Sequence, residues 1–505
     1  MISSQKFINN KHDVVTEALD GLLMLNSNKL IRYKNTQIIQ LKDPNPDQIS
    51  LICGGGSGHE PAHAGFVEKN MLTSAICGGV FASPSHKEIL QGILSVPNKH
   101  GVLLIIKQYT GDVINFELAA SLARAQGIKV ETIHVGEDAA FEQDKRGLAG
   151  TVVLYKILGG LVSQFKWQNL QKIKEFGEKV IQNIKTVGCG LGGCSLPGQN
   201  ANFSVDPGYV EIGLGIHGEK GVSLIKFDSA KKLIQDLLGY FNFQKDYQQN
   251  NEVLVVLNNL GSTTELELMI LIKEILEQMK EKKINVKRVV CGKIMSSLEM
   301  HGISLTILNI FDPLIVEVLD LQVENPFWVI FKNFSFEIKK MYREISFDDF
   351  QKIDTKVVYE SPFHCLMEKI FTHLISKENL FNKLDAQVGD GDTGTGVTRA
   401  SLACLSILKH LNFEKEAKKC FARLGEEIAG AFGGTCGPLY GVFLSSASLC
   451  LKDELKMNGK EEFLNGLKKD QIKLNLQEKL KKEIGLWWIC QNLLKKIFRK
   501  KQITK

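Results

Sequence analysis

The sequence predicts an α/β region over residues 1–335 and an all-α domain from about residue 356. In the first region, short β-branched or apolar runs alternate with amphipathic stretches of helix length, a pattern typical of α/β proteins with largely buried sheets. Beyond residue 356 the strand-like runs stop, and the apolar residues recur with helical spacing. Residues 336–355 are charged and aperiodic, so we expect a linker there.

The strand candidates are β-branched or apolar runs bounded by Gly, Asn or Asp. They are ISLIC near residues 50–53 and the runs 101–107, 129–135, 221–227, 252–259, 286–294 and 303–310. Amphipathic stretches such as 114–126 and 264–282 lie between several of them and predict helices. In the second region, helical periodicity covers 360–381 and 401–432.

Composition excludes several classes of protein. With 505 residues, of which 44% are hydrophobic and 23% charged, the chain is typical of globular proteins and long enough for several cores. Its apolar runs are too short to cross a bilayer, and its first residues lack the unbroken apolar stretch of a signal peptide, so we expect no membrane partner. The eleven cysteines follow no paired spacing, which favours reduced thiols and a cytoplasmic location.

The formal net charge of +6 does not indicate a nucleic-acid partner. Residues 451–505 hold 15 Lys and Arg against 7 Asp and Glu, a local charge of +8, so the other 450 residues carry −2. A nucleic-acid-binding domain spreads its basic groups over a folded face. Because the excess is confined to one end of the sequence, we expect no nucleic-acid partner.

A glycine-rich stretch, GGGSGHEPAHAG at 54–65, follows the first strand candidate. It lacks the Gly-Lys pair of a phosphate-binding loop, the third glycine of a dinucleotide fingerprint and the closing glycine of a nucleophile elbow. Since glycine is used where the main chain approaches a ligand closely, we predict a strand-to-loop junction at a ligand, with His59 and His63 beside it. An ordinary glycine-rich turn is the alternative.

Two further stretches carry groups that are able to take part in chemistry. Lys107 ends a predicted strand, and its ammonium group is able to bind a polar oxygen. Asp112 lies in the loop beyond, and its carboxylate is able to accept a proton or to hydrogen-bond a substrate hydroxyl. Alternatively, Lys107 is solvated and Asp112 caps a helix. His217 stands in a glycine-rich stretch, and its imidazole suits a base, a metal ligand, a nucleophile or a structural hydrogen-bonding group.

Three carboxylates lie within eight residues in LDAQVGDGDTGTG, at Asp385, Asp390 and Asp392. Carboxylates this close repel one another unless a cation compensates, and their oxygens suit a hard ion such as Mg²⁺. The TGTG that follows offers amides for phosphates, and AFGGTCGPLYG at 431–441 predicts a second glycine-rich loop, between helices, for the rest of a nucleotide. An acidic surface loop is the alternative.

Eight blocks stand in order between about residues 5 and 465: GGGSGHEPAHAGF, GGVFASPS, IIKQYTGDVINFE, DKRGLAGTVVLYKI, LGIHGEKG, VLNNLGSTTELEL, LDAQVGDGDTGTG and GGTCGPLYG. Together they resemble the two-domain, ATP-dependent dihydroxyacetone (glycerone) kinases. The resemblance implies an N-terminal domain of two α/β lobes that binds dihydroxyacetone, and a C-terminal antiparallel helical barrel that binds MgATP. It also implies a homodimer in which the nucleotide domain of one chain faces the substrate domain of the other.

The resemblance implies a role for each matching residue. His217 would attack the ketone and hold it as a covalent hemiaminal, while His59 and Asp112 would take the proton from the hydroxyl that attacks the γ-phosphate. The substrate contacts would be Gly56, Ser57, Gly58, His59, Ser83, Lys107 and Asp112. Two Mg²⁺ ions would be held by Asp385, Asp390 and Asp392, and ATP by Thr393, Gly394, Thr395, Gly396, Thr435 and Cys436. The implied activity is phosphorylation of dihydroxyacetone, and of glyceraldehyde.

The sequence departs from the family pattern in two places. Cys436 stands where the family usually has Ser. After the segment FLNGLKKD, the later Gly-Asp-(Arg/Lys)-Thr-Met lid motif and the closing Gly-Arg-Ala segment are missing. We therefore expect an incomplete helical domain at 356–465 and a divergent basic tail at 466–505, from a truncated or mis-spliced reading frame. A membrane-surface helix at LWWICQNLLKKIFRKK is the alternative for the tail.

Two alternatives to the kinase function follow from this. An incomplete nucleotide domain would suit a catalytically impaired, ketose-binding sensor or regulatory protein. Some members of the family also cleave flavin adenine dinucleotide to a cyclic flavin phosphate with Mn²⁺ in the helical domain, and the sequence does not decide whether this chain does.

Overall fold

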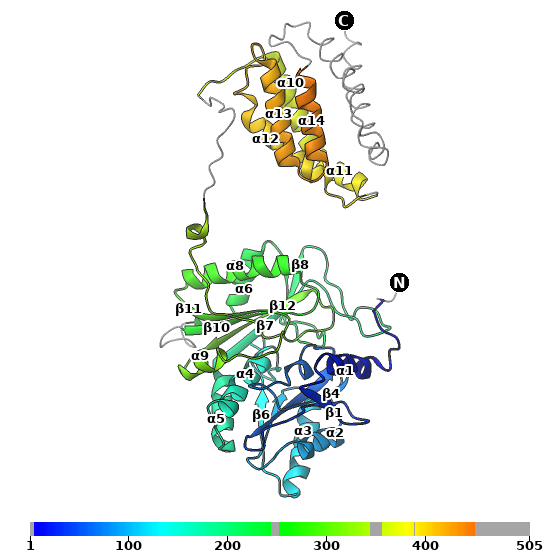
Figure 1. Cartoon of the computed structure of the whole chain (residues 1–505), viewed down its shortest axis with the longest axis vertical. Coiled ribbons are helices and arrows are strands. Elements are labelled where there is room, and N and C mark those ends of the chain that lie inside the picture. Colours follow the sequence, from blue (N-terminus) through cyan, green and yellow to red (C-terminus); the bar gives the residue numbers. More distant parts are fainter. Residues whose placement is uncertain (1–4, 244–251, 344–355, 388, 450–505) are drawn as a thin grey trace. The chain divides into compact units, whose positions relative to one another are not determined.

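The computed structural model describes residues 5–243, 252–343, 356–387 and 389–449 (Figure 1). The chain divides into two compact units, between Tyr342 and Arg343. Most of the predicted linker and all of the predicted tail lie outside the described residues, as does everything after residue 449. The linker, the tail and the incompleteness of the helical domain therefore stay predictions.

The first sheet of the N-terminal unit has six strands in the order β1-β2-β4-β3-β5-β6. Strand β3 is parallel to both β4 and β5, and β5 is parallel to β6, so the carboxyl ends of these strands meet at one edge, where ligands bind in such sheets. Strands β1 and β2 add an antiparallel edge. The bounds are β1 Leu30–Arg32, β2 Ile38–Leu41, β3 Ser50–Ser57, β4 Ser74–Val80, β5 Val102–Lys107 and β6 Val130–Val135.

The second sheet has seven strands in the order β13-β11-β10-β12-β7-β8-β9. Only β10 and β11 are parallel, and the other neighbours run antiparallel. The bounds are β7 Ile184–Gly190, β8 Tyr209–Ile212, β9 Ser223–Lys226, β10 Glu252–Asn259, β11 Asn285–Gly292, β12 Gly302–Asn309 and β13 Ile330–Phe331.

Helix α4 (Gly150–Ser163) joins the two sheets into one unit. Every residue of this helix except Ser163 is buried, because it packs in a core that also contains residues of β3, β5, β10 and β12. Glycines 159 and 160 in this helix approach other segments too closely to admit a side chain. The remaining helices of the unit are α1 Val14–Leu25, η1 Ala64–Phe66, α2 His86–Ser95, α3 Thr110–Ala125, α5 Leu170–Asn183, α6 Ala230–Leu238, α8 Glu265–Glu281, α9 Leu314–Leu319 and η2 Ile338–Met341.

The described residues of the C-terminal unit form helices and no strand. Phe371, Leu408, Phe413, Phe421 and Leu424 lie in its apolar core. The prediction of an α/β region followed by an all-α domain is therefore confirmed. The helices are α10 Pro362–Ile375, α11 Glu378–Asp385, α12 Thr393–Leu408, α13 Ala417–Phe432 and α14 Cys436–Leu449.

Every predicted strand is present, and the structure has six further strands that the sequence pattern does not predict: β1, β2, β4, β7, β8 and β13. These strands are short or, as in β4 and β7, contain glycines that interrupt the β-branched pattern. The glycine-rich junction was also placed too early. Gly54, Gly55 and Gly56 belong to β3 itself, which ends at Ser57. Among the described residues, no helix combines the length and apolar character that a membrane crossing needs.

Candidate active site

A buried ion pair joins the end of β5 to the start of α3. Nζ of Lys107 donates to Oδ2 of Asp112 and to the main-chain oxygen of Gly54, each at 2.9 Å. The two side chains are 0% and 6% exposed, so the alternative of a solvated Lys107 is wrong. The predicted position of Asp112 in a loop, or as a helix cap, is also wrong, because α3 already begins at Thr110 and its N-cap is Tyr109.

Gly55 leaves the space that this ion pair occupies. Its φ is +149°, and a Cβ atom there would lie 2.2 Å from Nζ of Lys107, 3.2 Å from Oδ2 of Asp112 and 3.3 Å from Nε2 of His63. Only glycine allows polar side chains to come so close to the main chain. The prediction from the sequence places Gly56, and not Gly55, at the substrate, although the run of three glycines includes both.

His59 lies just beyond β3 and is fully buried. Its Nδ1 atom is 2.9 Å from the main-chain oxygen of Ser296, which only accepts, so Nδ1 carries the ring proton. Burial, and then the charges of His217 and Lys107, hold the pKa of His59 well below its ordinary value. Nε2 therefore keeps its lone pair, and it has no hydrogen-bond partner among the described residues. Such an atom is able to accept a proton from a bound hydroxyl.

His217 lies in the loop between β8 and β9, with its side chain 21% exposed and so open to a ligand. The centroid of its ring is 4.9 Å from that of His59, 5.2 Å from that of Phe81 and 4.6 Å from that of Tyr109. Its Nδ1 lies 3.1 Å from Oε1 of Glu219. Because a carboxylate accepts, Nδ1 carries the proton and Nε2 offers the lone pair that a nucleophile needs.

Two of the other predicted substrate contacts already have partners within the protein. The hydroxyl of Ser57 donates to the main-chain oxygen of Gly78 at 2.8 Å. The amide of Gly58 donates to the carboxylate of Glu60 at 3.0 to 3.1 Å. These contacts hold the main chain after β3 in place. Ser57 and Gly58 therefore shape the site by fixing the position of this turn.

Gly56 and Ser83 lie where the end of β3 meets the segment after β4. A Cβ atom on Gly56 would be 2.7 Å from the amide nitrogen of Ala82, so the two main-chain segments touch. Ser83 faces the start of α3, because a Cβ atom on Gly111 would lie 3.4 Å from that of Ser83. All the predicted substrate residues thus come from the N-terminal unit.

Two buried polar atoms at this place have no hydrogen-bond partner among the described residues: Nε2 of His59 and Nε2 of His63. The other nitrogen of His63, Nδ1, lies 2.6 Å from the hydroxyl of Tyr155. Buried polar groups are almost always hydrogen-bonded in native proteins. A small ligand rich in oxygens would supply the partners that these atoms lack.

The three predicted metal ligands come together in the C-terminal unit. Asp385 ends α11, Asp392 is the N-cap of α12, and Asp390 lies between them. One carboxylate oxygen from each lies within 4.8 Å of the others. The carboxylate of Asp390 raises the pKa of Asp392, as expected for crowded acids. Oxygen ligands at this spacing fit a divalent cation, which would offset their repulsion.

The TGTG segment was predicted to offer free amides to phosphates, but two of its amides already have partners within the protein. Thr393 to Gly396 form the first turn of α12. The amide of Thr393 donates to Oδ2 of Asp385, and that of Thr395 donates to Oδ1 of Asn382. The helix N-terminus still favours anions electrostatically.

The second glycine-rich loop, predicted at 431–441, is shorter than expected: α13 extends to Phe432 and α14 begins at Cys436, so only residues 433–435 form a loop. Gly433 and Gly434 have φ values of +80° and +56°, which glycine adopts without strain. They bring Thr435 to the start of α14, whose first residue is Cys436.

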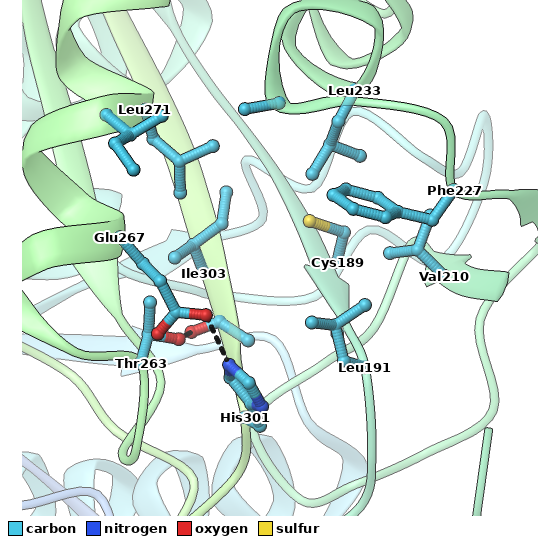
Figure 2. A pocket seen from close by; sticks show the side chains of 14 residues that line it. Cys189, Leu191, Val210, Phe227, Leu233, Thr263, Glu267, Leu271, His301 and Ile303 are labelled. Atoms are coloured by element: carbon cyan, nitrogen blue, oxygen red, sulfur yellow. Dashed lines mark hydrogen bonds and ion pairs between the residues drawn. The ribbon is translucent and has the colours of Figure 1, made fainter. Parts of the chain in front are cut away.

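A separate apolar pocket lies on the second sheet, beside α6 and α8 (Figure 2). Its volume is about 200 Å³, and its walls include Cys189, Phe227 and Leu271. The charged groups among its lining residues, Glu267 and His301, are paired with each other at 2.9 Å. It contains none of the predicted site residues and offers a small polar ligand few partners, so we do not assign the substrate to it.

Comparison with known proteins identifies the family. Residues 20–327 match the Dak1 domain, and residues 387–477 match the DAK2 domain. The chain is 34% identical over 466 residues to the triokinase/FMN cyclase of Homo sapiens, a match that covers 89% of this chain and 80% of the human protein. The chain belongs to the dihydroxyacetone kinase family.

Other members of the family match one or both units. The dihydroxyacetone kinase of C. freundii in complex with AMP-PNP and Mg²⁺ has 30% identity and a TM-score of 0.65, covering 93% of this chain and 87% of that one. The dihydroxyacetone-binding subunit DhaK of a PTS-dependent dihydroxyacetone kinase from Listeria innocua is 38% identical over 330 residues, 64% of this chain and all of that protein. The family resemblance drawn from the sequence is confirmed.

Proposed function

We propose that the protein transfers the γ-phosphoryl group of ATP to dihydroxyacetone, with glyceraldehyde as a second acceptor. The observation that carries this proposal is the contact between His217 and His59, each with an Nε2 lone pair, beside the buried pair of Lys107 and Asp112. A nucleophile, a base and a buried cation meet there around atoms that lack partners. The names of the family members supply the substrate.

The first step fixes the ketone. Nε2 of His217 attacks the carbonyl carbon, so that a C–N bond forms and the C=O π pair moves to the oxygen. The oxygen takes up one proton and the ring gives up its Nδ1 proton. The product is a hemiaminal, which positions the substrate. Glycerol has no carbonyl and cannot be held in this way. Gly56, Ser57, Gly58 and Ser83 would shape the pocket around it.

The second step is phosphoryl transfer. Nε2 of His59 and the carboxylate of Asp112 would take the proton of the substrate hydroxyl as its oxygen attacks the γ-phosphorus. Lys107 would keep Asp112 in place through their 2.9 Å contact and neutralise its buried charge.

In the C-terminal unit, Asp385, Asp390 and Asp392 would hold Mg²⁺, which when bound neutralises charge on the phosphates. The nucleotide contacts would be Thr393, Gly394, Thr395, Gly396, Thr435 and Cys436. We also propose a cytoplasmic homodimer. Cys53, Cys77, Cys189 and Cys404 are buried free thiols, which supports a reducing compartment.

Release of ADP from MgATP in the presence of dihydroxyacetone tests the proposal, with glycerol as the unreactive control. His217→Ala should abolish both the covalent adduct and turnover. Asp390→Asn combined with Asp392→Asn should abolish ADP release and leave the adduct intact. An adduct without any ADP release from the unmodified protein would instead support the ketose sensor.

The human relative is named a triokinase/FMN cyclase. We therefore propose, as a second activity, cyclising cleavage of flavin adenine dinucleotide in the helical unit. Incubation with this dinucleotide and Mn²⁺ should then release AMP and a cyclic flavin phosphate. Because that reaction needs no ketone, His217→Ala should not affect it.

A further inference from the structure

Glu219 lies between His217 and the ion pair of Arg146 with Asp138. Its Oε1 lies 3.1 Å from Nδ1 of His217, and its Oε2 accepts from the main-chain amide of His217 at 3.0 Å. On its other side, Oε2 lies 3.9 Å from Nη1 of Arg146. The carboxylate thus holds the imidazole at two points and faces a guanidinium.

Arg146 is itself fixed in place. Its Nε and Nη2 atoms donate to Oδ2 of Asp138 at 2.8 and 2.6 Å, and Nη2 also donates to the main-chain oxygen of Gly213 at 2.7 Å. The side chains of Arg146 and Asp138 are 12% and 0% exposed. A guanidinium held by several hydrogen bonds in so little solvent has one orientation.

Gly215 leaves room for the contact between Glu219 and Arg146. A Cβ atom on this glycine would lie 2.3 Å from Oε2 of Glu219 and 2.7 Å from Nη1 of Arg146. The loop that carries His217 is therefore built around the carboxylate, and Glu219 is not a surface charge that happens to lie near a histidine.

We infer that Glu219, oriented by Arg146 and Asp138, is the positioning residue that makes His217 a nucleophile. It keeps the proton on Nδ1, so that the lone pair stands on Nε2, and it fixes the ring plane toward the ketone. This inference rests on the proposed function, since it concerns how the proposed adduct forms.

Glu219 also compensates the charge that the addition creates. When Nε2 bonds to the carbonyl carbon, the ring becomes cationic until Nδ1 loses its proton, while the carbonyl oxygen gains one. The ring thus gives up one proton and the oxygen gains one, so the addition is neutral overall. The carboxylate stabilises the cationic ring and is placed to accept the Nδ1 proton. Its own negative charge is favoured: burial raises the pKa of Glu219, but the hydrogen bond from His217, the charge of that ring when it is cationic, and the charge of Arg146 outweigh this and leave the pKa lowered.

The test uses the full-length protein and dihydroxyacetone labelled with ¹³C at the carbonyl carbon. In the unmodified protein the bound carbon signal should move from the ketone to the tetrahedral region. Glu219→Gln, which keeps the shape and loses the charge, should slow the appearance of this signal and lower kcat/KM for dihydroxyacetone by about 100-fold, with the KM for ATP unchanged. Glu219→Asp, which keeps the charge, should recover part of the loss.

Glu267→Gln is the matched control, because Glu267 forms the same kind of pair with His301, at 2.9 Å, in the same unit. Glutamine also keeps the capping box that Glu267 makes with Thr264, so the helix should stay intact. This variant should form the adduct at the rate of the unmodified protein.

The two proposals fail in different ways. Absence of the adduct in the unmodified protein would contradict the proposed function. An adduct that forms equally fast in the unmodified protein and in folded Glu219→Gln would overturn only the inference about Glu219. Should Glu219→Gln not fold, Glu219→Asp decides: its carboxylate is drawn back by one methylene, so adduct formation at the rate of the unmodified protein would overturn the inference.

Discussion

Nζ of Lys107 and Oδ2 of Asp112 lie 2.9 Å apart at the edge of the first sheet, and solvent reaches almost none of either side chain. Nζ also donates to the main-chain oxygen of Gly54, so one cation holds β3, the end of β5 and the start of α3 together. The pair therefore contributes to the fold as well as to the proposed reaction, and the two contributions can be measured separately.

Lys107→Met should destabilise the N-terminal unit strongly. It leaves the carboxylate of Asp112 buried without its cation, and breaking a buried pair in this way costs about 3–5 kcal/mol. Thermal or urea unfolding measures the loss. The double variant Lys107→Met with Asp112→Leu should recover most of the stability while remaining inactive. A single variant as stable as the unmodified protein would contradict the burial of the pair.

Gly55→Ala should disrupt the site, because its Cβ atom would lie 2.2 Å from Nζ of Lys107 and because φ is +149°. Backbone strain alone costs about 1–3 kcal/mol, and displacement of Lys107 should reduce ketose turnover further. Gly79→Ala is the control, since its Cβ atom would meet only Ala82, at 3.7 Å. Equal activity of both variants would be inconsistent with the close approach at Gly55.

The stability of the N-terminal unit should fall with acidification below about pH 6.5. Burial, with smaller effects of neighbouring charges, holds the pKa values of His59 and His63 well below their ordinary range. The unfolded chain therefore binds protons that the folded chain does not, and each histidine adds up to about 1.4 kcal/mol per pH unit to the slope. His63→Gln should reduce the slope of the free energy of unfolding against pH, between pH 6.5 and 5, by about the contribution of one histidine. Above about pH 7 the slopes of the variant and of the unmodified protein should coincide.

Mg²⁺ should stabilise the C-terminal unit through its three carboxylates. At about 100 times the dissociation constant, the gain is about 2.7 kcal/mol, seen as a higher unfolding temperature. Because Asp390 raises the pKa of Asp392, acid should weaken this effect at a higher pH than it would for an isolated aspartate. Asp390→Asn should reduce the shift, and Glu414→Gln, which alters an exposed acid elsewhere in the unit, should not. EDTA should stop ADP release but leave the adduct.

Much of the fold was predictable because it follows from local patterns. The run GVLLIIK is apolar up to Ile106 and ends at Lys107, which is the last residue of β5. Strands such as β4 and β7 were not predictable in this way, because their glycines serve close contacts with other segments rather than a local preference. A Cβ atom on Gly78 would lie 2.0 Å from the main-chain oxygen of Ala82, and one on Gly188 would lie 2.4 Å from that of Leu214.

The candidate site divides in the same way. The sequence named His59, His217 and the three aspartates of the C-terminal unit, because their residue types and spacing belong to a family pattern. It did not distinguish a solvated Lys107 from a buried one, and it passed over Glu219, although that residue stands only two positions from His217. The roles of these residues depend on their burial and on which charge faces them.

The sequence by itself determined the order of the two domains, the strands with continuous apolar patterns, the acidic cluster and the family. Only the tertiary structure decided that Ser296 sets the tautomer of His59, that Asp112 is paired and buried, and that Glu219 faces Arg146. The reason is physical. Periodicity along a chain reports local geometry, whereas the charge and proton position of a side chain depend on groups that come within a few ångströms of it after folding.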